Sequence, residues 1–177
     1  MRGGRQLFLK TRLSICLFWL AVLVSARPGV AQSQAELKQK LQQFAFMVGE
    51  WHCTGHFTTS GKAIEANLNF APSLQGVWLE FRHDDLPPNI YHALTLWAWD
   101  NSTGKYVSLI QDNFGGHRTF TSEGWKQNEL VWLRDTTQDE RFIFHKSTDN
   151  EFSVAYQRIK EGDWREADVS TCKRTTK

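Results

Sequence analysis

The sequence is poor in proline and cysteine and has no long apolar segment. Its 177 residues include four Pro, three Cys and 12 Gly, which excludes collagen-like, low-complexity and disulfide-dense chains. The longest apolar stretch, 13–26, has 14 residues, whereas a transmembrane helix needs roughly 20. With 41% hydrophobic and 13% aromatic residues, the composition instead indicates one globular domain.

Acidic residues are absent from the first 31 positions, which contain five Lys or Arg. The other 146 residues contain 16 basic and 19 acidic side chains, a net charge of −3. A domain of this charge, without a stripe of basic residues, lacks the positive surface that binds phosphate backbones. We therefore expect no nucleic-acid partner.

Motifs of common enzymes and metal sites are also missing. The sequence has no Gly-x-Ser-x-Gly elbow, phosphate loop or dinucleotide fingerprint. His52 and His56 fall in an expected strand, where positions four apart lie about 13 Å apart, too far for one zinc ion with bonds of roughly 2 Å. Asp84 and Asp85, before two prolines, are interpreted as a solvated loop. We expect no metal, no cofactor and no catalytic motif.

Residues 1–31 have the order of a secretory signal peptide: basic residues, an apolar stretch, then small residues before a cleavage point. Gly29 and Ala31 occupy the −3 and −1 positions, so we expect the mature chain to begin at Gln32. A lipid anchor at Cys16 is disfavoured because the apolar stretch continues well past it. The sequence thus predicts a periplasmic or secreted protein that keeps no stable membrane anchor.

Cleavage would remove Cys16 and leave Cys53 and Cys172. An oxidising compartment favours a disulfide between them. The alternative is two buried free thiols that never meet, and the choice depends on the fold.

One amphipathic helix is expected at the start of the mature chain. Ser33 and Glu36 have the spacing of a capping box, with Ser33 as the N-cap. Apolar residues follow at helical spacing: Leu37, Leu41, Phe44 and Val48. The predicted helix covers 34–48 and ends at Gly49.

After Gly49 the apolar residues alternate with period two to the C-terminus, which predicts an all-β domain over 32–177 behind this helix. Turn residues divide the alternation into about ten strands: 51–57, 64–70, 77–83, 91–99, 105–111, 118–125, 129–134, 141–146, 152–159 and 164–173. Short turns favour an antiparallel up-and-down barrel over a sandwich, and closure removes both edge strands. Closure makes the first and last strands neighbours, which favours the Cys53–Cys172 disulfide.

Gly49-Glu50-Trp51 matches the Gly-x-Trp start of lipocalin-like (calycin) barrels. The chain also has Phe46-Met47-Val48 before this motif, Gly55 after it, and Gly-Val-Trp-Leu at 76–79. With these residues it resembles a bacterial family of exported calycin-like barrels of unknown function, and the resemblance covers residues 37–174. The resemblance implies a barrel with a cavity, and it implies that Trp51 packs against Arg174. It implies no established activity.

Nitrobindins, which bind haem, share the Gly-x-Trp start. Their first strand is glycine-rich and ends in Tyr-Pro, whereas this chain continues as 52–57, His-Cys-Thr-Gly-His-Phe. Their haem ligand is a His near the C-terminus, but the last histidine here is His145. Haem binding of this type is therefore not expected.

Seven of the eight tryptophans lie after the leader, and they either fill the barrel or line a pocket in it. If Trp51 and Cys53 point inward, then, barring a bulge, pairing with the last strand also turns inward Ser170, Asp168, Glu166 and Trp164. Buried carboxylates need partners, and Arg158 and Arg134 are the nearest candidates. These charges form either a recognition group for a ligand or an ion-paired plug. The candidate ligand-binding residues are Trp97, Trp132, Arg134, Tyr156, Arg158 and Glu166.

The function that these features favour is binding of a small apolar or aromatic molecule in the barrel lumen. One alternative is an enzyme that uses lumen acids such as Glu166 with Arg158. Another is a structural component of the cell envelope. The identity of the ligand and the oligomeric state are left open by the sequence.

Overall fold

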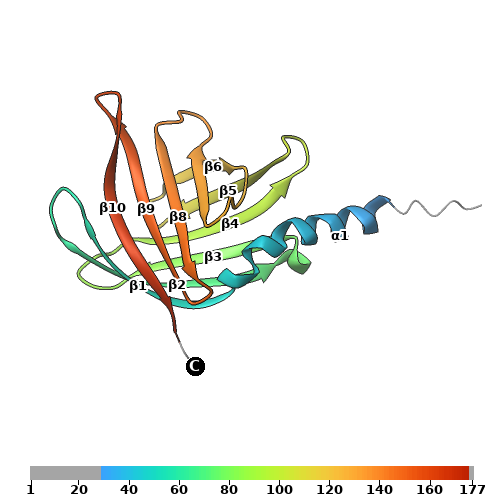
Figure 1. The fold of residues 1–177 in the computed structure, drawn as a ribbon, viewed down its shortest axis with the longest axis horizontal. Coiled ribbons are helices and arrows are strands. Elements are labelled where there is room, and N and C mark those ends of the chain that lie inside the picture. The colour runs from blue at the N-terminus through green and yellow to red at the C-terminus, as the bar shows by residue number, and fades with distance from the viewer. Residues whose placement is uncertain (1–28, 176–177) are drawn as a thin grey trace, which may run out of the picture.

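The structure is a computed structural model that describes residues 29–175. The chain forms helix α1 (Gly29–Leu41), a 3-10 helix η1 (Gln42–Met47) and ten strands, with a short 3-10 turn η2 (Leu74–Gly76) before the third strand (Figure 1). The strands are β1 (Gly49–Phe57), β2 (Ala63–Ser73), β3 (Trp78–Asp85), β4 (His92–Asp100), β5 (Lys105–Asp112), β6 (His117–Ser122), β7 (Glu129–Arg134), β8 (Glu140–Thr148), β9 (Glu151–Lys160) and β10 (Asp163–Arg174).

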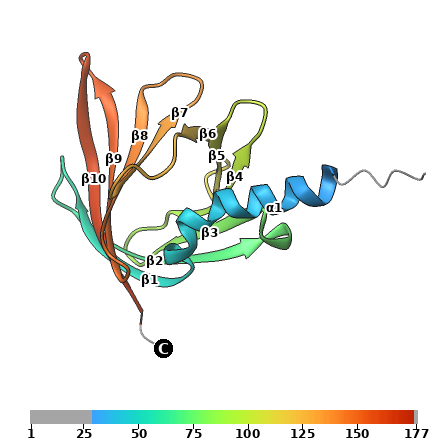
Figure 2. The ribbon, with the colours of Figure 1, turned by 45° about the vertical axis from the view of Figure 1, so that its right-hand side comes forward.

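The strands close into one antiparallel barrel, in which each strand pairs with its neighbour in sequence and β1 pairs with β10. Figure 2 shows β8, β9 and β10 along one side and α1 beside β3. The predicted closed ten-stranded antiparallel barrel is therefore confirmed. Two strands extend beyond their predicted ends: β2 continues to Ser73, and β3 continues to Asp85, where the alternation persists and Asp85 is buried.

The helix differs from the predicted segment 34–48 at both ends. It begins at Gly29, before the predicted cap Ser33, because no helix-breaking residue separates the two. It ends at Leu41, and the chain tightens into η1. A 3-10 helix has three residues per turn, so Leu41, Phe44 and Met47 lie on one face, and all three are buried.

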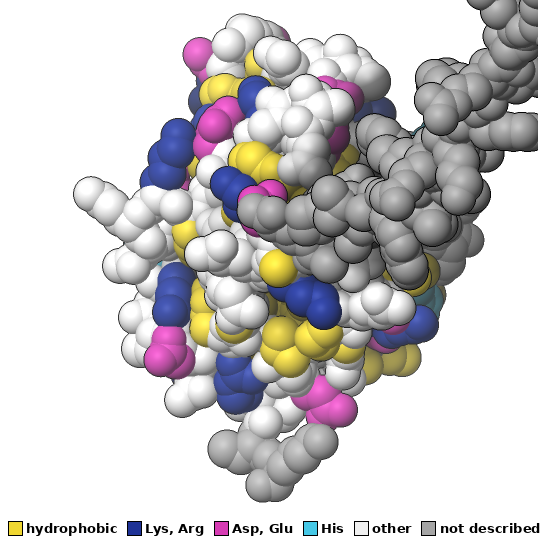
Figure 3. Space-filling view, turned by 90° about the vertical axis from the view of Figure 1, so that its right-hand side faces the viewer, with side chains coloured by type: hydrophobic (Ala, Val, Ile, Leu, Met, Phe, Trp, Pro, Cys, Tyr) yellow, Lys and Arg dark blue, Asp and Glu magenta, His cyan; other side chains and the backbone are white. Residues whose placement is uncertain are grey.

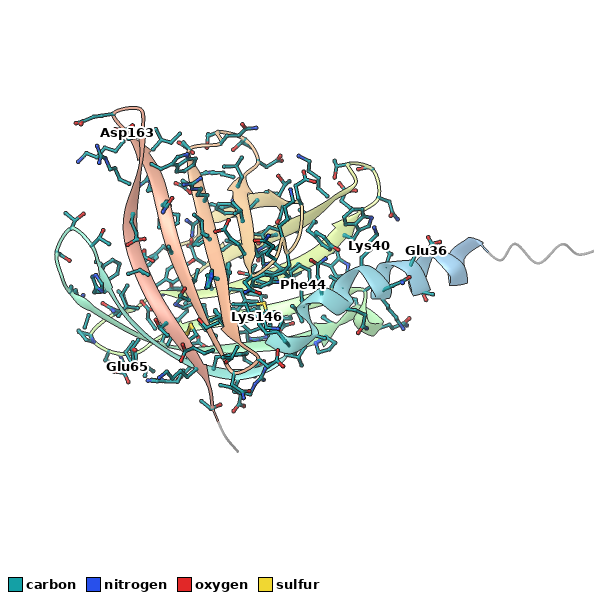
Figure 4. All side chains as sticks on the ribbon, in the orientation of Figure 1. Glu36, Lys40, Phe44, Glu65, Lys146 and Asp163 are labelled. Carbon is teal, nitrogen blue, oxygen red and sulfur yellow. A yellow bond between two sulfur atoms is a disulfide. The ribbon has the colours of Figure 1, made fainter. Side chains whose placement is uncertain are left out.

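The buried face of η1 closes one end of the barrel. The Phe44 ring lies 5.4 Å from the Trp97 ring and 5.2 Å from the Tyr106 ring, measured between centroids. Trp51 Nε1 donates a hydrogen bond of 2.7 Å to the Met47 carbonyl. Figure 4 shows Phe44 where α1 meets the barrel and Asp163 at the far tip of β10. The mouth is this far end, where the β1–β2, β3–β4, β5–β6, β7–β8 and β9–β10 turns lie.

The surroundings of Gly49, in the Gly-x-Trp start, and of Gly55, four positions after Trp51, explain why both are glycine. Gly49 has a φ of 122°, and a Cβ there would lie 2.8 Å from Arg174 Nη1. Gly55 lies where β1 and β10 approach closely, because a Cβ there would lie 2.0 Å from the Val169 carbonyl oxygen. Both positions therefore require glycine.

Cys53 and Cys172 are directly opposite each other in the β1–β10 register, with Cα atoms 4.0 Å apart, and they form a disulfide. Both side chains are buried in the core. The predicted disulfide is thus present, and it joins the two strands that no hairpin turn connects.

The seam between β6 and β7 is the least paired part of the ring. These two strands, both fully described, pair at two positions, Phe120 with Arg134 and Thr121 with Leu133. By contrast, β1 and β10 pair at seven positions. The wall at β6 and β7 therefore depends more on side chains than on backbone hydrogen bonds.

The predicted signal peptide lies largely outside the described residues, and its expected cleavage point after Ala31 falls within α1. No helix in the described part of the chain is long and apolar enough to cross a membrane. On the face shown in Figure 3, outside the area drawn in grey, acidic, basic and apolar side chains are interspersed.

Candidate functional site

A cavity of about 350 Å³ lies in the barrel lumen. Its inner part is lined by side chains that alternate inward from six strands: Cys53, Leu68, Phe81, Trp97, Trp132 and Phe144. Its charged or ionisable lining residues His83, Asp85, Arg118 and Asp168 lie on the halves of the strands nearer the mouth. The cavity therefore has an apolar floor and a polar end, an arrangement typical of small-molecule sites.

Trp97 is the centre of the aromatic floor. Its ring centroid lies 5.0 Å from that of Trp132, 5.6 Å from that of Phe144 and 5.6 Å from that of Phe81. The indole N–H of Trp132 is buried and has no hydrogen-bond partner among the described residues.

Two polar residues of β3 continue its inward-facing series beyond Leu79 and Phe81. His83 Nε2 and Asp85 Oδ1 lie 2.8 Å apart, and both residues line the cavity. Asp85 is 8% exposed, so its assignment to a solvated loop is wrong: β3 continues through it and buries it against the lumen. Asp84, one position earlier, does face outward, where it pairs with His92.

Asp168 is the lumen carboxylate of the last strand. It lies opposite Phe57 of β1 and opposite Tyr156 of β9 in the strand register, so aromatic side chains lie on both sides of it. Asp168 and Ser170 both line the cavity, which confirms their predicted inward orientation.

The ionisation of Asp168 is strongly perturbed. Burial raises the pKa of its carboxyl to about 6, the Asp85 and Glu166 carboxylates add to the increase, and His83 opposes it. A carboxyl in this position changes charge just below neutral pH, whereas an unperturbed Asp does so near pH ~4.

Across the mouth, Arg118 of β6 also lines the cavity. Its Nη2 donates a 3.1 Å hydrogen bond to the Tyr91 hydroxyl, and its Nη1 lies 3.7 Å from Glu140 Oε2. Burial alone would lower the pKa of Arg118, but nearby Tyr91, Tyr156 and Glu140 raise it. Arg118 is therefore a cation with partners already in place.

Glu140 is the buried centre of an arginine cluster. It is 4% exposed, and its Oε1 lies 3.0 Å from Arg134 Nη1 and 3.5 Å from Arg158 Nε. With Arg118 these contacts join four consecutive strands, from β6 to β9, and they span the poorly paired β6–β7 seam. Burial, together with the Glu140 charge, raises the pKa of the neighbouring Tyr156 hydroxyl to about 12.

Of the six predicted ligand-binding residues, Trp97, Trp132 and Tyr156 line the cavity. Arg134 and Arg158 pair with Glu140 and do not line it. Their acidic partner is thus Glu140, and not the carboxylates of the last strand for which they were the predicted partners.

The prediction that Glu166 faces the lumen is wrong. The pairing of β10 with β9 shifts between Glu166 and Asp168, and this irregularity places Glu166 opposite the outward-facing Gln157. Glu166 is exposed as a result. Trp164 is shifted in the same way, and its ring lies 4.2 Å from the Arg141 guanidinium, which itself contacts Gln157.

Sequence reasoning missed five polar residues of the mouth: His83, Asp85, Tyr91, Arg118 and Glu140. The signal was present for all five, because each continues an alternating series, as Arg118 does with Phe120 and Tyr91 does with Ala93. Two predicted strands were too short: 77–83 left out Asp85, and 141–146 left out Glu140.

Two loops beside the mouth are tied together and present apolar side chains. Asn113 Nδ2 donates a 2.7 Å hydrogen bond to the Ile90 carbonyl, and the Phe114 and Tyr91 rings stack with centroids 6.4 Å apart. Ile90 is 65% exposed and Phe114 is 66% exposed. The rim at β3–β4 and β5–β6 is therefore apolar.

Within residues 29–175, no group of three or more His, Cys, Asp or Glu side chains is arranged to hold a metal ion. His52 faces outward and contacts Asn67 and Glu65, as expected for a polar residue opposite the core. No protein-family model matches the chain, and no curated protein matches it.

Proposed function

We propose that the barrel binds a small molecule that has an apolar or aromatic body and a polar group. The proposal rests on one observation: a cavity of about 350 Å³ with an aromatic floor and ionisable groups at its open end. A volume of this size is within the range of ligand sites, roughly 300 to 1,000 Å³. The aromatic body would lie against Trp97 and Trp132, and the polar group would lie among His83, Asp168 and Arg118.

The proposal extends to the fold family and the compartment. We propose a lipocalin-like (calycin) up-and-down barrel of the bacterial exported family, which is supported by the packing of Arg174 over Trp51 and by the pairing of strands in sequence order. The Cys53–Cys172 disulfide supports export to the periplasm or beyond, since disulfides persist in oxidising compartments.

An acid–base enzyme is the second candidate. It is supported by Asp168, whose pKa of about 6 suits proton transfer near neutral pH, beside the hydrogen-bonded His83 and Asp85 pair. A purely structural role would favour a filled lumen, and the cavity supports binding over that alternative.

Ligand binding is tested by filling the cavity from inside. Ala93 lines the cavity, partly buried, next to His83 in the strand register. The Ala93→Phe variant should bind at least about tenfold more weakly any molecule that quenches tryptophan emission. Thr54→Phe, at an exposed position of β1, is the matched control and should bind like the unmodified protein.

The ligand itself can be sought by native mass spectrometry of protein purified from its own host. A bound small molecule absent from Ala93→Phe would support the proposal. If apolar and aromatic compounds of many kinds change neither the emission nor the melting temperature of the unmodified protein, the proposal is wrong.

A further inference from the structure

The charged groups at the mouth are unequally paired. His83 pairs with Asp85, while Arg118, Arg134 and Arg158 surround Glu140. Asp168 is left without an ion-pair partner among the described residues.

The carboxylate of Asp168 also faces the space that a ligand would fill. It lines the cavity near the mouth, and the strand register places Phe57 and Tyr156 on either side of it. An anion flanked by aromatic rings is the surrounding that suits an ammonium group, since the ion pairs with the carboxylate and also contacts the electron-rich ring faces.

The charge balance of the lining favours the same kind of ligand. Four of the charged or ionisable lining residues are His83, Asp85, Arg118 and Asp168. Asp85 contacts His83, and Arg118 lies beside Glu140, so Asp168 is the acidic lining residue for which no basic partner is found among the described residues, and a bound cation would pair with it. The cation already in the lining, Arg118, is hydrogen-bonded to Tyr91 and lies beside Glu140, so a ligand anion would have to compete with those groups.

We propose that the molecule bound in the lumen is an amine, with its ammonium group at Asp168 between Phe57 and Tyr156, and its apolar or aromatic body against Trp97 and Trp132. This inference rests on the proposed binding function and specifies the class of ligand. A buried ion pair is favourable only when further contacts compensate for desolvation, and here the neighbouring rings and the open mouth supply them.

The test compares three probes with the same body and different head groups: phenylbutylamine, phenylbutanol and phenylbutanoate. Dissociation constants are measured at pH 7.5 by quenching of tryptophan emission and by calorimetry, on the full mature chain. We expect the amine to bind about tenfold or more tightly than the alcohol, and the carboxylate to bind most weakly.

The Asp168→Asn variant keeps the size of the side chain and removes its charge. It should bind the amine about tenfold more weakly and leave binding of the alcohol unchanged. Glu166→Gln, two positions away but on the outer face, is the matched control and should change both affinities by less than about twofold. Circular dichroism and melting temperature establish that each variant is folded.

The outcomes separate this inference from the binding function beneath it. If alcohol and amine bind equally, or if the carboxylate binds best, the lumen is a binding site but the choice of an amine is wrong. An equal loss in Asp168→Asn and Glu166→Gln would also overturn the assignment to Asp168. If none of the three probes binds, both proposals fail.

Discussion

The Arg174 guanidinium lies 4.3 Å from the centroid of the Trp51 ring. The same guanidinium donates a 2.8 Å hydrogen bond from Nη1 to the Val48 carbonyl and another from Nη2 to the Phe46 carbonyl. One side chain of the last strand thus holds the first strand and the segment that closes the barrel. The relationship between Trp51 and Arg174 is the one that the lipocalin-like resemblance implies.

Arg174→Gln should lower the free energy of unfolding by about 2 kcal/mol or more, because it removes charge-assisted hydrogen bonds and the stacked cation together. Urea denaturation followed by tryptophan emission measures the change. Lys173→Gln, on the adjacent outward-facing position, should change stability by less than about 0.5 kcal/mol. Equal effects in the two variants would contradict the assigned role of Arg174.

Gly55→Ala should destabilise the barrel by about 3 kcal/mol or prevent folding, because the added methyl group would overlap the backbone of β10. Thr54→Ala, at the exposed neighbouring position, is the control and should have a small effect. Thermal unfolding of both variants is sufficient to compare them. A Gly55→Ala protein as stable as the control would mean that β1 and β10 do not approach as closely as described.

The Cys53–Cys172 bond should be detectable as an absence of alkylatable thiols in the mature, unreduced, denatured protein, by intact mass. The bond joins residues 119 positions apart, for which the chain-entropy model gives on the order of 4 to 5 kcal/mol and typical measurements give about 2 to 4. Reduction, or the double substitution to Ala, should therefore lower the urea midpoint substantially. Two alkylatable thiols before reduction would rule the bond out.

Asp168 should make the ligand-free protein less stable as the pH rises. Its carboxyl has a folded pKa of about 6, above the ~3.9 of an unfolded chain, so the folded state binds more protons between these values. The unfolding free energy contributed by this group therefore falls from about pH 4 to pH 6, by up to about 3 kcal/mol.

Asp168→Asn should consequently raise stability at pH 7.5 and leave it nearly unchanged at pH 4. Glu166→Gln removes only the smaller contribution of a neighbouring carboxylate and should show a much smaller change, and His83→Gln tests whether the neighbouring imidazole contributes to the pH dependence. Urea midpoints at the two pH values give the comparison. A stabilisation by Asp168→Asn that is the same at both pH values would contradict the role of ionisation.

Export predicts that the protein recovered from the periplasm or the medium begins at Gln32. Because α1 extends to Leu41, such a product would retain ten residues of the helix. N-terminal sequencing determines the first residue. An intact Met1 in the soluble periplasmic fraction would contradict cleavage.

Alternation of apolar residues was sufficient to predict the number of strands, the closure of the barrel and the inward orientation of Trp51, Cys53 and Asp168. It was sufficient because each strand buries one face, so that the period of two persists along the whole strand. The same rule failed at Glu166, where one irregularity in the register reverses the face. No residue type in the segment 163–168 marks that irregularity.

The polar half of the site was harder to predict for a different reason. Polar residues at strand ends look like loop residues, as Asp85 and Glu140 did, and their burial depends on partners from other strands. Glu140 is buried because Arg118, Arg134 and Arg158 converge on it. Such convergence is a property of the closed ring and is not visible in any one segment.

The sparse pairing of β6 with β7 gives the barrel wall two unlike joints. The covalent joint between Cys53 and Cys172 and the weak joint at Phe120 are separated by four strands in one direction round the ring and by six in the other. The wall is closed covalently between β1 and β10, and it is held by the fewest backbone pairs between β6 and β7. A force that parted the wall would therefore break the fewest backbone pairs at the β6–β7 seam, where the contacts of Arg118 and Arg134 with Glu140 hold the two strands together.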